Sequence, residues 1–239
     1  MKNKRVLVTG ASRGIGAATA AAFHLQGAFV VGVATKKPAD SDISGSVSEW
    51  FEADFCDPGS LSDFCQKIER TEAFDVCVNN AGINIIKPLT EISREDFEKI
   101  NKINVEAPFS ICRAVVPGMQ SLGGGRIVNV ASIWSLITKS NRSLYSTTKA
   151  ALAGMTRALA VEFSSSQILI NSVSPGFTMT ELTKRSLSEK ERTELAQAVP
   201  LGRFAMVKEI AESILFLSSE RNTYITGQNL VVDGGFSII

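Results

Sequence analysis

Short apolar runs alternate with helix-patterned segments along most of this chain. Six runs, rich in β-branched residues and bounded by Gly or Asn, are typical of buried parallel strands. They are Val6–Val8, Phe29–Val33, Val76–Val78, Ile127–Val130, Ile168–Val173 and Leu230–Val232. The helical segments between them are Gly14–Gln26, Ser60–Arg70, Arg94–Gln120, Tyr145–Phe163 and Lys208–Ser218. The alternation predicts an α/β fold: a doubly wound, Rossmann-type parallel sheet of about seven strands with helices on both faces.

Length and charge narrow the classes of function. At 239 residues the chain is long enough for one sizeable core and short for two, so we expect a single domain over residues 1–239. Its 25 basic and 24 acidic side chains nearly cancel, which leaves no global field to attract nucleic acid or an anionic membrane. We expect a small-molecule substrate, with no nucleic acid and no membrane as partner.

Composition also indicates the compartment and excludes some chemistry. No apolar run reaches the ~18 residues of a membrane span, and Val6–Val8 is too short for a signal-peptide core. The four cysteines form no CxxC pair, as expected of thiols in a reducing compartment, so we expect a cytoplasmic protein. With His24 as the one histidine, a His-based triad or zinc cluster has almost no raw material, and we expect no metal.

A glycine-rich turn connects the first predicted strand to the first predicted helix. It reads Thr9-Gly-Ala-Ser-Arg-Gly-Ile-Gly16. Backbone amides and the helix dipole at such a turn can hold a pyrophosphate, and glycines let the chain approach it closely. Taken alone, the turn could also serve packing. The residues expected to bind a dinucleotide here are Gly10, Ser12, Arg13, Gly14, Ile15 and Gly16.

The end of the second predicted strand bears on the choice of cofactor. An acidic residue there would bind the ribose hydroxyls and repel a 2′-phosphate, but the chain offers Ala34-Thr-Lys-Lys37. We expect Thr35 and Lys36 to contact the cofactor, and Arg13 with a lysine to neutralise the phosphate. NADP(H) is therefore the preferred cofactor and NAD(H) the alternative, in which case the lysines are only a solvated loop.

Several motifs, in fixed order from Arg5 to Gly235, resemble the short-chain dehydrogenase/reductase family. They are the Gly-x-x-x-Gly-x-Gly turn, Asn79-Asn-Ala-Gly82, Ser132, Tyr145-Ser-Thr-Thr-Lys149, Pro175-Gly176 and Val232-Asp-Gly-Gly235. The resemblance implies further cofactor contacts. They are Asp54 and its neighbour Phe55 near the adenine, Asn80, Ala81 and Gly82 along the adenosine, and Pro175, Gly176 and Thr178 at the nicotinamide.

The resemblance also implies a catalytic group of Ser132, Tyr145 and Lys149. The last two lie four residues apart in a predicted helix and so share a face, while Ser132 follows the strand at 127–130, at the rim where such sheets bind ligands. Taken one at a time, a serine, tyrosine or lysine at such a position more often has a structural role than a catalytic one. A free tyrosine, with a pKa near ~10, is a poor base. We expect Lys149 and the oxidised cofactor to lower the pKa of Tyr145, and Ser132 to hold the substrate oxygen. Tyr145 and Lys149 would both contact the cofactor.

Asn104 matches the family's fourth catalytic position, whose main-chain carbonyl binds a water that connects to the lysine. Pro108 lies four residues later and has no N–H. The Asn104 carbonyl would therefore lack its usual helical partner and be open to water. The alternative is that Pro108 only marks a kink or a new helix.

Three functions are compatible with these motifs. The first is an NAD(P)-dependent oxidoreductase that moves a hydride between nicotinamide and a small carbonyl or secondary alcohol. The second is a 3-oxoacyl-[acyl-carrier-protein] reductase, which the sequence also resembles, and the third is a non-catalytic dinucleotide sensor. Reductases of the acidic carrier usually carry basic side chains where this chain has Leu122–Gly125 and Ser164–Gln167, which favours the first function. Arg113, Arg126 or Arg142 could compensate.

The resemblance further implies a homodimer or homotetramer, paired through the helices equivalent to Asn104–Gln120 and Tyr145–Phe163. The polar segment Thr178–Phe204 is helical in pattern and has no strand partner, so we expect a substrate lid at about 178–204. With the segments Ile133–Ser135 and Ile83–Pro88 it would form the substrate pocket.

Overall fold

One parallel sheet of seven strands forms the centre of the protein, in the order β3-β2-β1-β4-β5-β6-β9. The computed structural model describes residues 1–39 and 45–239. The strands are β1 (Arg5–Thr9), β2 (Phe29–Ala34), β3 (Glu49–Glu52), β4 (Val76–Asn79), β5 (Gly125–Val130), β6 (Ile168–Pro175) and β9 (Asn229–Val232). The predicted doubly wound sheet is confirmed. The strand order reverses between β1 and β4, which is where sheets of this kind bind ligands.

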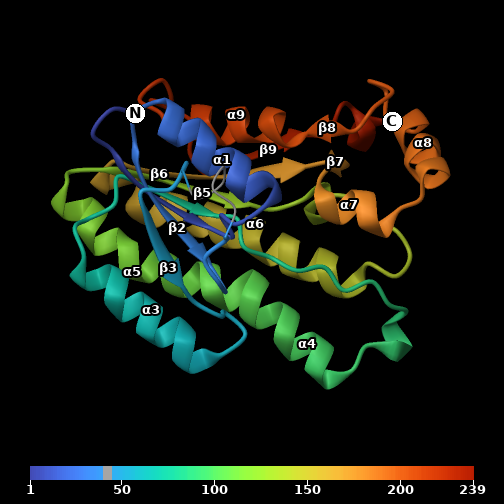
Figure 1. Ribbon diagram of the computed structural model, residues 1–239, viewed down its shortest axis with the longest axis horizontal. Coiled ribbons are helices and arrows are strands. Elements are labelled where there is room, and N and C mark those ends of the chain that lie inside the picture. The colour runs from blue at the N-terminus through green and yellow to red at the C-terminus, as the bar shows by residue number, and fades with distance from the viewer. Residues whose placement is uncertain (40–44) are drawn as a thin grey trace.

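Helices cover both faces of the sheet (Figure 1). One face carries α1 (Gly14–Leu25) and α9 (Val207–Ser218), which pack together; the other carries α3 (Pro58–Arg70), α5 (Ala107–Ser121) and α6 (Ser143–Phe163). Alternate residues of each strand enter two separate apolar cores, so Val6 and Val8 lie in one core and Leu7 in the other. This two-sided burial explains why the strands are continuous apolar runs.

The helix ends follow from local residues. The side chain of Asp57 accepts the N–H of Gly59 and begins α3. Ser93 and Asp96 form a reciprocal capping box at the start of α4 (Arg94–Asn101). Gly27, at φ 80°, adopts the left-handed conformation just after α1.

The predicted helix over Arg94–Gln120 is confirmed as one helical stretch, but it is not α-helical throughout. A π-helical turn at Lys102–Glu106 lies between α4 and α5. Pro108 lies in the first turn of α5, where its missing N–H removes a normal helical hydrogen bond. The turn places Asn104 inside the protein, 1% exposed. A π-helical turn of this kind often marks a functional position.

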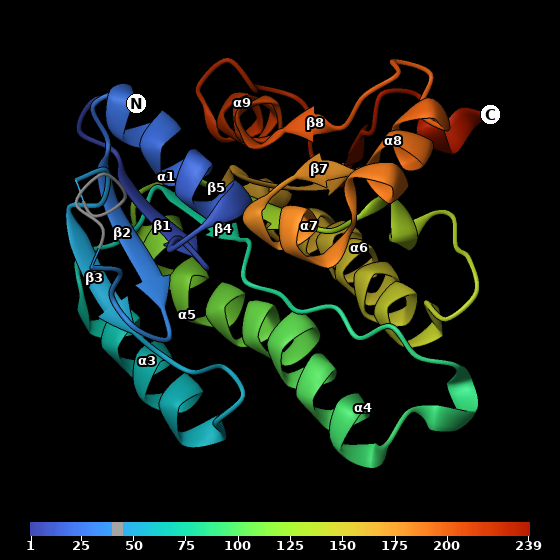
Figure 2. The same ribbon diagram turned by 45° about the vertical axis from the view of Figure 1, so that its right-hand side comes forward.

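The segment between β6 and α9 contains α7 (Glu181–Ser186) and α8 (Glu189–Gln197). Contrary to expectation, it has a strand partner, because β7 (Thr178–Met179) pairs in parallel with β8 (Ala205–Met206). Phe177 stacks on Phe204 with ring centroids 5.3 Å apart and also contacts Phe236 edge-on at 5.0 Å. These contacts fix both ends of the segment, which lies on the side of the molecule that holds the C-terminus (Figure 2).

The edge strand β3 is not among the six apolar runs, since it consists of Glu-Trp-Phe-Glu. The segment Lys36–Glu52 is rich in Ser and Asp and is too short to predict a full crossover helix, but it falls partly on residues 40–44, outside the described residues. Within the described part of the chain, no helix is long and apolar enough to cross a membrane.

Candidate active site

A cavity of about 320 Å³ lies where the strand order reverses. It is bounded by the glycine-rich turn after β1 and by the carboxyl ends of β2, β3 and β4. Most residues predicted to bind a dinucleotide line this cavity: Gly10, Ser12, Arg13, Gly14, Ile15, Thr35, Asp54, Phe55, Asn80, Ala81 and Gly82.

The cavity wall also includes residues that were not predicted to bind the cofactor. They are Val33, Ala34, Ala53, Ile83, Ile103, Thr180 and Glu181. Of these, Ile83 belongs to the predicted substrate pocket, and Thr180 and Glu181 belong to the predicted lid. Val33, Ala34 and Ala53 end strands β2 and β3, so their position in the fold could have indicated them. Thr180 and Glu181 come from the start of α7, a contact that no sequence pattern shows. Other predicted cofactor residues lie outside this lining, namely Gly16, Lys36, Tyr145, Lys149, Pro175, Gly176 and Thr178.

The geometry of the glycine-rich turn requires glycine. Gly10 and Gly14 have φ of 65° and 58°, a region that side chains strongly disfavour. At Gly16 a Cβ would overlap the carbonyl oxygen of Gly10 and the side-chain amide of Asn80. The turn can therefore approach a ligand with bare backbone at the amino end of α1, an arrangement that fits a pyrophosphate.

Asn80 fixes this turn to β4. Its side-chain amide donates to the carbonyl oxygens of Thr9 at 2.9 Å and Gly10 at 3.2 Å. In return the hydroxyl of Thr9 accepts the backbone N–H groups of Asn80 and Ala81, each at 3.0 Å. Asn80 thus shapes the cavity through the glycine turn. On the opposite wall, the carboxylate of Asp54 accepts the N–H of Cys56 at 2.9 Å.

The structure brings Ser132, Tyr145 and Lys149 together at the carboxyl end of β5. Ser132 follows that strand and lies 7% exposed, and its hydroxyl is near enough to the Tyr145 phenol to lower the pKa of that phenol. Tyr145 and Lys149 lie one turn apart on α6, and the Lys149 Nζ is 5.7 Å from the centroid of the Tyr145 ring. The same Nζ donates to the carbonyl oxygen of Val130 at 2.8 Å. Three side chains from two elements therefore converge on one point.

The electrostatics differ from expectation in one respect. Burial raises the pKa of the Tyr145 phenol above its ordinary value, and the Ser132 hydrogen bond and the Arg142 charge oppose that shift. The expected lowering of the Tyr145 pKa by Lys149 is thus not what the cofactor-free protein shows. Burial also lowers the pKa of Lys149 itself to about 8, which weakens it as a permanent cation.

Asn104 connects the loop after β4 to the catalytic helix. Its side-chain amide exchanges two hydrogen bonds, each 2.9 Å, with the backbone N–H and carbonyl of Ile83. Its Nδ2 also donates to the hydroxyl of Thr148 at 3.1 Å, and that hydroxyl donates to the Tyr145 carbonyl at 2.8 Å. The side chain therefore has a positioning role, while the expected water at the main-chain carbonyl stays a prediction.

Known proteins match this chain over nearly its whole length. Residues 10–237 match a family model described as enoyl-(acyl carrier protein) reductase. The chain is 36% identical over 243 residues to 3-oxoacyl-[acyl-carrier-protein] reductase of Escherichia coli, a match that covers 100% of this chain and 99% of the relative. A solved "short chain dehydrogenase/reductase family protein" is 33% identical and superposes with a TM-score of 0.90, covering 100% and 99% of the two chains. The chain belongs to the short-chain dehydrogenase/reductase family.

A second solved structure is similar over its whole length. It is a putative NAD(P)-dependent gluconate 5-dehydrogenase from Beutenbergia cavernae with bound NADP, 31% identical, with a TM-score of 0.94 and coverage of 100% and 98%. As a short-chain dehydrogenase/reductase, the protein is an NAD(P)-dependent oxidoreductase that transfers a hydride between nicotinamide and a carbonyl or secondary alcohol.

Hydrogen bonds from two neighbouring strands support the Ser132 turn in this short-chain dehydrogenase/reductase. The hydroxyl of Ser135 donates to the Ser132 carbonyl at 2.7 Å and lies 3.2 Å from the hydroxyl of Ser174 on β6. Asn229, on β9, donates to Ser135 at 3.2 Å and accepts from Ser174 at 2.7 Å. Ser174 and Asn229 were not predicted, and Ser135 was predicted only as part of the substrate pocket, because their mutual contact depends on the pairing of β5, β6 and β9.

The residues predicted at the nicotinamide form the exit from β6. The N–H of Gly176 donates to the carbonyl of Val232 at 3.0 Å, and a Cβ at Gly176 would be 2.7 Å from the Cα of Asp233. The Thr178 hydroxyl donates to the Gly176 carbonyl at 3.1 Å. This tight turn directs the chain from the sheet into β7 and α7.

Proposed function

We propose that the protein is an NADP(H)-preferring reductase of small polar carbonyl compounds that uses Ser132, Tyr145 and Lys149 as its catalytic residues. The observation that carries this proposal is the convergence of Ser132, at the end of β5, with Tyr145 and Lys149, which lie one turn apart on α6 with the Lys149 Nζ 5.7 Å from the Tyr145 ring centroid. A protein that only sensed a dinucleotide would not need this constellation, which argues against that alternative.

Each residue has one role in the proposal. The Ser132 hydroxyl holds the substrate oxygen, and the Tyr145 phenol gives that oxygen a proton in reduction and takes it back in oxidation. Lys149, held by the Val130 carbonyl, stabilises the tyrosinate when its amine is protonated. The bound nicotinamide supplies or accepts the hydride. Asn104 positions Tyr145 through Thr148.

The cofactor assignment rests on the cavity wall. The glycine turn and Asn80 to Gly82 would hold the pyrophosphate and adenosine, with Asp54 and Phe55 at the adenine. Arg13 and Thr35 line the cavity and Lys36 is exposed beside Thr35, so cations adjoin the ribose end. A carboxylate, that of Glu52, also contacts this loop and accepts the backbone N–H of Lys37 at 2.9 Å. The gluconate 5-dehydrogenase neighbour binds NADP. We place Pro175, Gly176 and Thr178 at the nicotinamide.

Residues 178–204 act in this proposal as the lid of the site, over the substrate pocket. Thr180 and Glu181 already reach the cofactor cavity from the start of α7. The aromatic contacts of Phe177 and Phe204 would provide two fixed ends for a moving segment.

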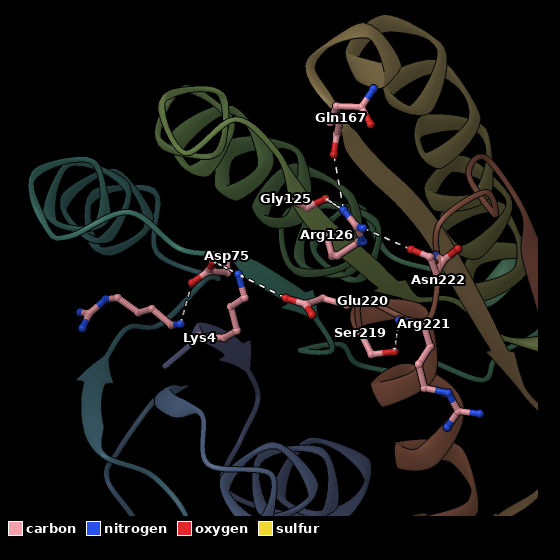
Figure 3. A network of polar contacts seen from close by, with 10 residues as sticks. Lys4, Asp75, Gly125, Arg126, Gln167, Ser219, Glu220, Arg221 and Asn222 are labelled. Carbon is pink, nitrogen blue, oxygen red and sulfur yellow. Dashed lines mark hydrogen bonds and ion pairs between the residues drawn. The ribbon is translucent and has the colours of Figure 1, made fainter. Parts of the chain in front are cut away.

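Arg126 lies at the start of β5, at the end of that strand away from Ser132, and its contacts favour a small substrate over an acidic carrier protein. The guanidinium of Arg126 donates to the carbonyl oxygens of Gly125, Gln167 and Asn222 at 2.9, 3.4 and 3.2 Å (Figure 3). Burial also lowers the pKa of Arg126. This arginine therefore stabilises the start of β5 and is not available to a partner. The reductase of acyl carrier protein remains the second candidate because of the Escherichia coli relative.

A screen of hydride transfer tests the proposal. The purified protein is mixed with NADPH or NADH and with sugar-derived ketones, simple ketones, acyl thioesters of N-acetylcysteamine and acyl carrier protein thioesters. The proposal expects turnover with NADPH and a small carbonyl. If kcat/KM for a thioester bound to acyl carrier protein is orders of magnitude higher than for the same thioester of N-acetylcysteamine, the protein is the acyl-carrier-protein reductase instead. No turnover with any substrate would overturn both.

Three helices carry exposed large apolar side chains that bear on the assembly of the protein. Phe97 on α4, Phe109 on α5 and Val161 on α6 are 53%, 54% and 81% exposed, which is unusual for large apolar side chains. We place these helices in the contacts of a homodimer or homotetramer, to be tested by light scattering. The four cysteines are unpaired, which suits the reducing cytoplasm.

A further inference from the structure

Two basic side chains flank the indole of Trp134, two residues after Ser132. The Arg142 guanidinium carbon lies 5.4 Å from the indole centroid, and the Lys139 Nζ lies 5.7 Å from it. Trp134 is itself buried, and its backbone N–H donates to the Ser132 hydroxyl at 3.3 Å. The two cations therefore lie against the side chain of a residue whose backbone contacts Ser132, the residue proposed to hold the substrate oxygen.

The positive charges have no protein counter-ion. Among the residues that the structure describes, no carboxylate lies within ion-pair distance of either side chain, and the buried Nε of Arg142 has no hydrogen-bond partner. Two arginines illustrate how such a group can be satisfied within the protein: Arg203 is paired with Glu209 at 2.7 Å, and Arg126, whose Nε is also without a partner, donates to backbone carbonyls through its terminal nitrogens. A half-buried guanidinium with a free donor is costly unless a ligand completes it.

Arg142 also faces the proposed proton donor. It lies three residues before Tyr145, at the start of α6, and its charge and the Tyr145 phenol influence each other's pKa values. Burial and the neighbouring Arg142 both lower the pKa of Lys139, as expected for two like charges held together. An anion between them would relieve this repulsion.

Resting on the proposed function, we propose that Arg142, assisted by Lys139, binds an anionic group of the substrate, so that the enzyme prefers carbonyl compounds that carry a carboxylate or a phosphate. A planar guanidinium can donate two parallel hydrogen bonds to either group. Stacking on Trp134 would keep it in place. The anion would hold the substrate carbonyl toward Ser132 and Tyr145.

Matched substrate pairs test this assignment and separate the two sources of negative charge. The carboxylate arm compares 5-ketogluconate with fructose, and acetoacetate with ethyl acetoacetate. The phosphate arm compares acetoacetyl-coenzyme A with acetoacetyl-N-acetylcysteamine. In at least one arm the wild-type enzyme should favour the anionic member in kcat/KM.

The variants then assign that preference to a residue. Arg142→Gln should raise KM for the anionic member by about tenfold or more relative to the neutral member, as expected for a lost charge-assisted hydrogen bond. A change in the pKa of Tyr145 caused by loss of the Arg142 charge affects kcat for both members alike, so the readout is the ratio of the two kcat/KM values. Arg142→Lys should retain part of the preference, and Lys139→Gln should lose less of it than Arg142→Gln. Arg70→Gln, which removes an exposed charge at the end of α3, is the control and should change neither. Equal losses for both members, or no anion preference in the wild type, would overturn the proposal.

If the enzyme turns over none of these substrates, that result counts against the proposed function but not against the anion site. A binding measurement then tests the anion site by itself. The cofactor-free protein is titrated with tartrate and with inorganic phosphate while tryptophan emission is followed. Because Trp134 contacts both cations, wild type and Arg70→Gln should show a saturable change with at least one anion, and Arg142→Gln should not. Absence of a saturable change in the wild type, or its persistence in Arg142→Gln, would contradict the anion site.

Discussion

The ammonium group of Lys149 donates a hydrogen bond to the main-chain carbonyl of Val130 at 2.8 Å, and it does so in a place where the lysine side chain is only 4% exposed. One carbonyl replaces little of the hydration that a charged amine loses on burial. The folded protein therefore holds this buried cation, which we propose to be catalytic, at a cost in stability, and that cost depends on pH.

The first prediction concerns this pH dependence. Burial lowers the pKa of Lys149 from 10.5 to about 8 on folding, so between these pH values the unfolded chain binds more protons and stability rises with pH. Relative to Lys149→Met, the wild type should gain about 3 kcal/mol in unfolding free energy from pH 8 to 10.5. Below pH 8 the difference should stay constant. Denaturant titrations of both proteins without cofactor measure it, and a difference that is flat across this range would contradict the buried, partly neutralised lysine.

The second prediction concerns the glycine turn. Gly16→Ala should destabilise the protein by about 1–3 kcal/mol and weaken cofactor binding strongly, because the new methyl overlaps the Gly10 carbonyl. Gly154→Ala is the matched control, since this glycine also lies in a helix but has room for a Cβ. It should raise stability by up to ~1 kcal/mol. Thermal melts and NADPH titrations of both variants give the comparison, and similar behaviour of the two would refute the steric account.

The third prediction concerns cofactor choice. Lys36→Asp, alone or with Lys37→Asp, should weaken NADPH far more than NADH, because a new carboxylate next to Thr35 repels the 2′-phosphate. Lys2→Asp, an exposed charge change near the amino end of β1, serves as the control and should affect both cofactors equally. Dissociation constants for each cofactor decide the matter. An equal loss for NADPH and NADH in Lys36→Asp would show that this loop does not recognise the phosphate.

The fourth prediction concerns Pro108 and the π-helical turn. Pro108→Ala restores an N–H four residues after Asn104, which should stabilise the helix and compete with the proposed water for the Asn104 carbonyl. Turnover should fall modestly, because a carbonyl can accept two hydrogen bonds. Pro117→Ala, at the other proline inside α5, should stabilise the protein without changing turnover. An unchanged kcat and pH profile in Pro108→Ala would leave Pro108 with a structural role only.

The sequence was sufficient for the features that depend on local pattern. Buried strands, capped helices and the order of Ser132, Tyr145 and Lys149 all follow from residues near one another in the chain. The edge strand β3 escaped prediction because Glu-Trp-Phe-Glu lacks the apolar run of a central strand. The π-helical turn escaped because helical periodicity continues through it.

What the sequence could not show depends on contacts between distant elements. The support of Ser132 by Ser135 and Asn229 requires β9 to lie beside β6. The raised pKa of Tyr145 depends on burial, which a list of neighbouring charges does not reveal. The same holds for the placement of Arg142 and Lys139 against one indole, since their spacing alone indicates only a basic loop.

The role of Tyr145 as the acid and base of the reaction is tested most directly by Tyr145→Phe. The variant keeps the ring and its packing on α6 and removes the hydroxyl that meets Ser132. Melting temperature and the dissociation constant of NADPH should stay close to those of the wild type. The kcat should fall by the ~10²–10⁴ typical of a lost general acid or base. A kcat within a factor of a few of the wild type, with cofactor binding intact, would contradict the assignment of Tyr145 as the proton donor.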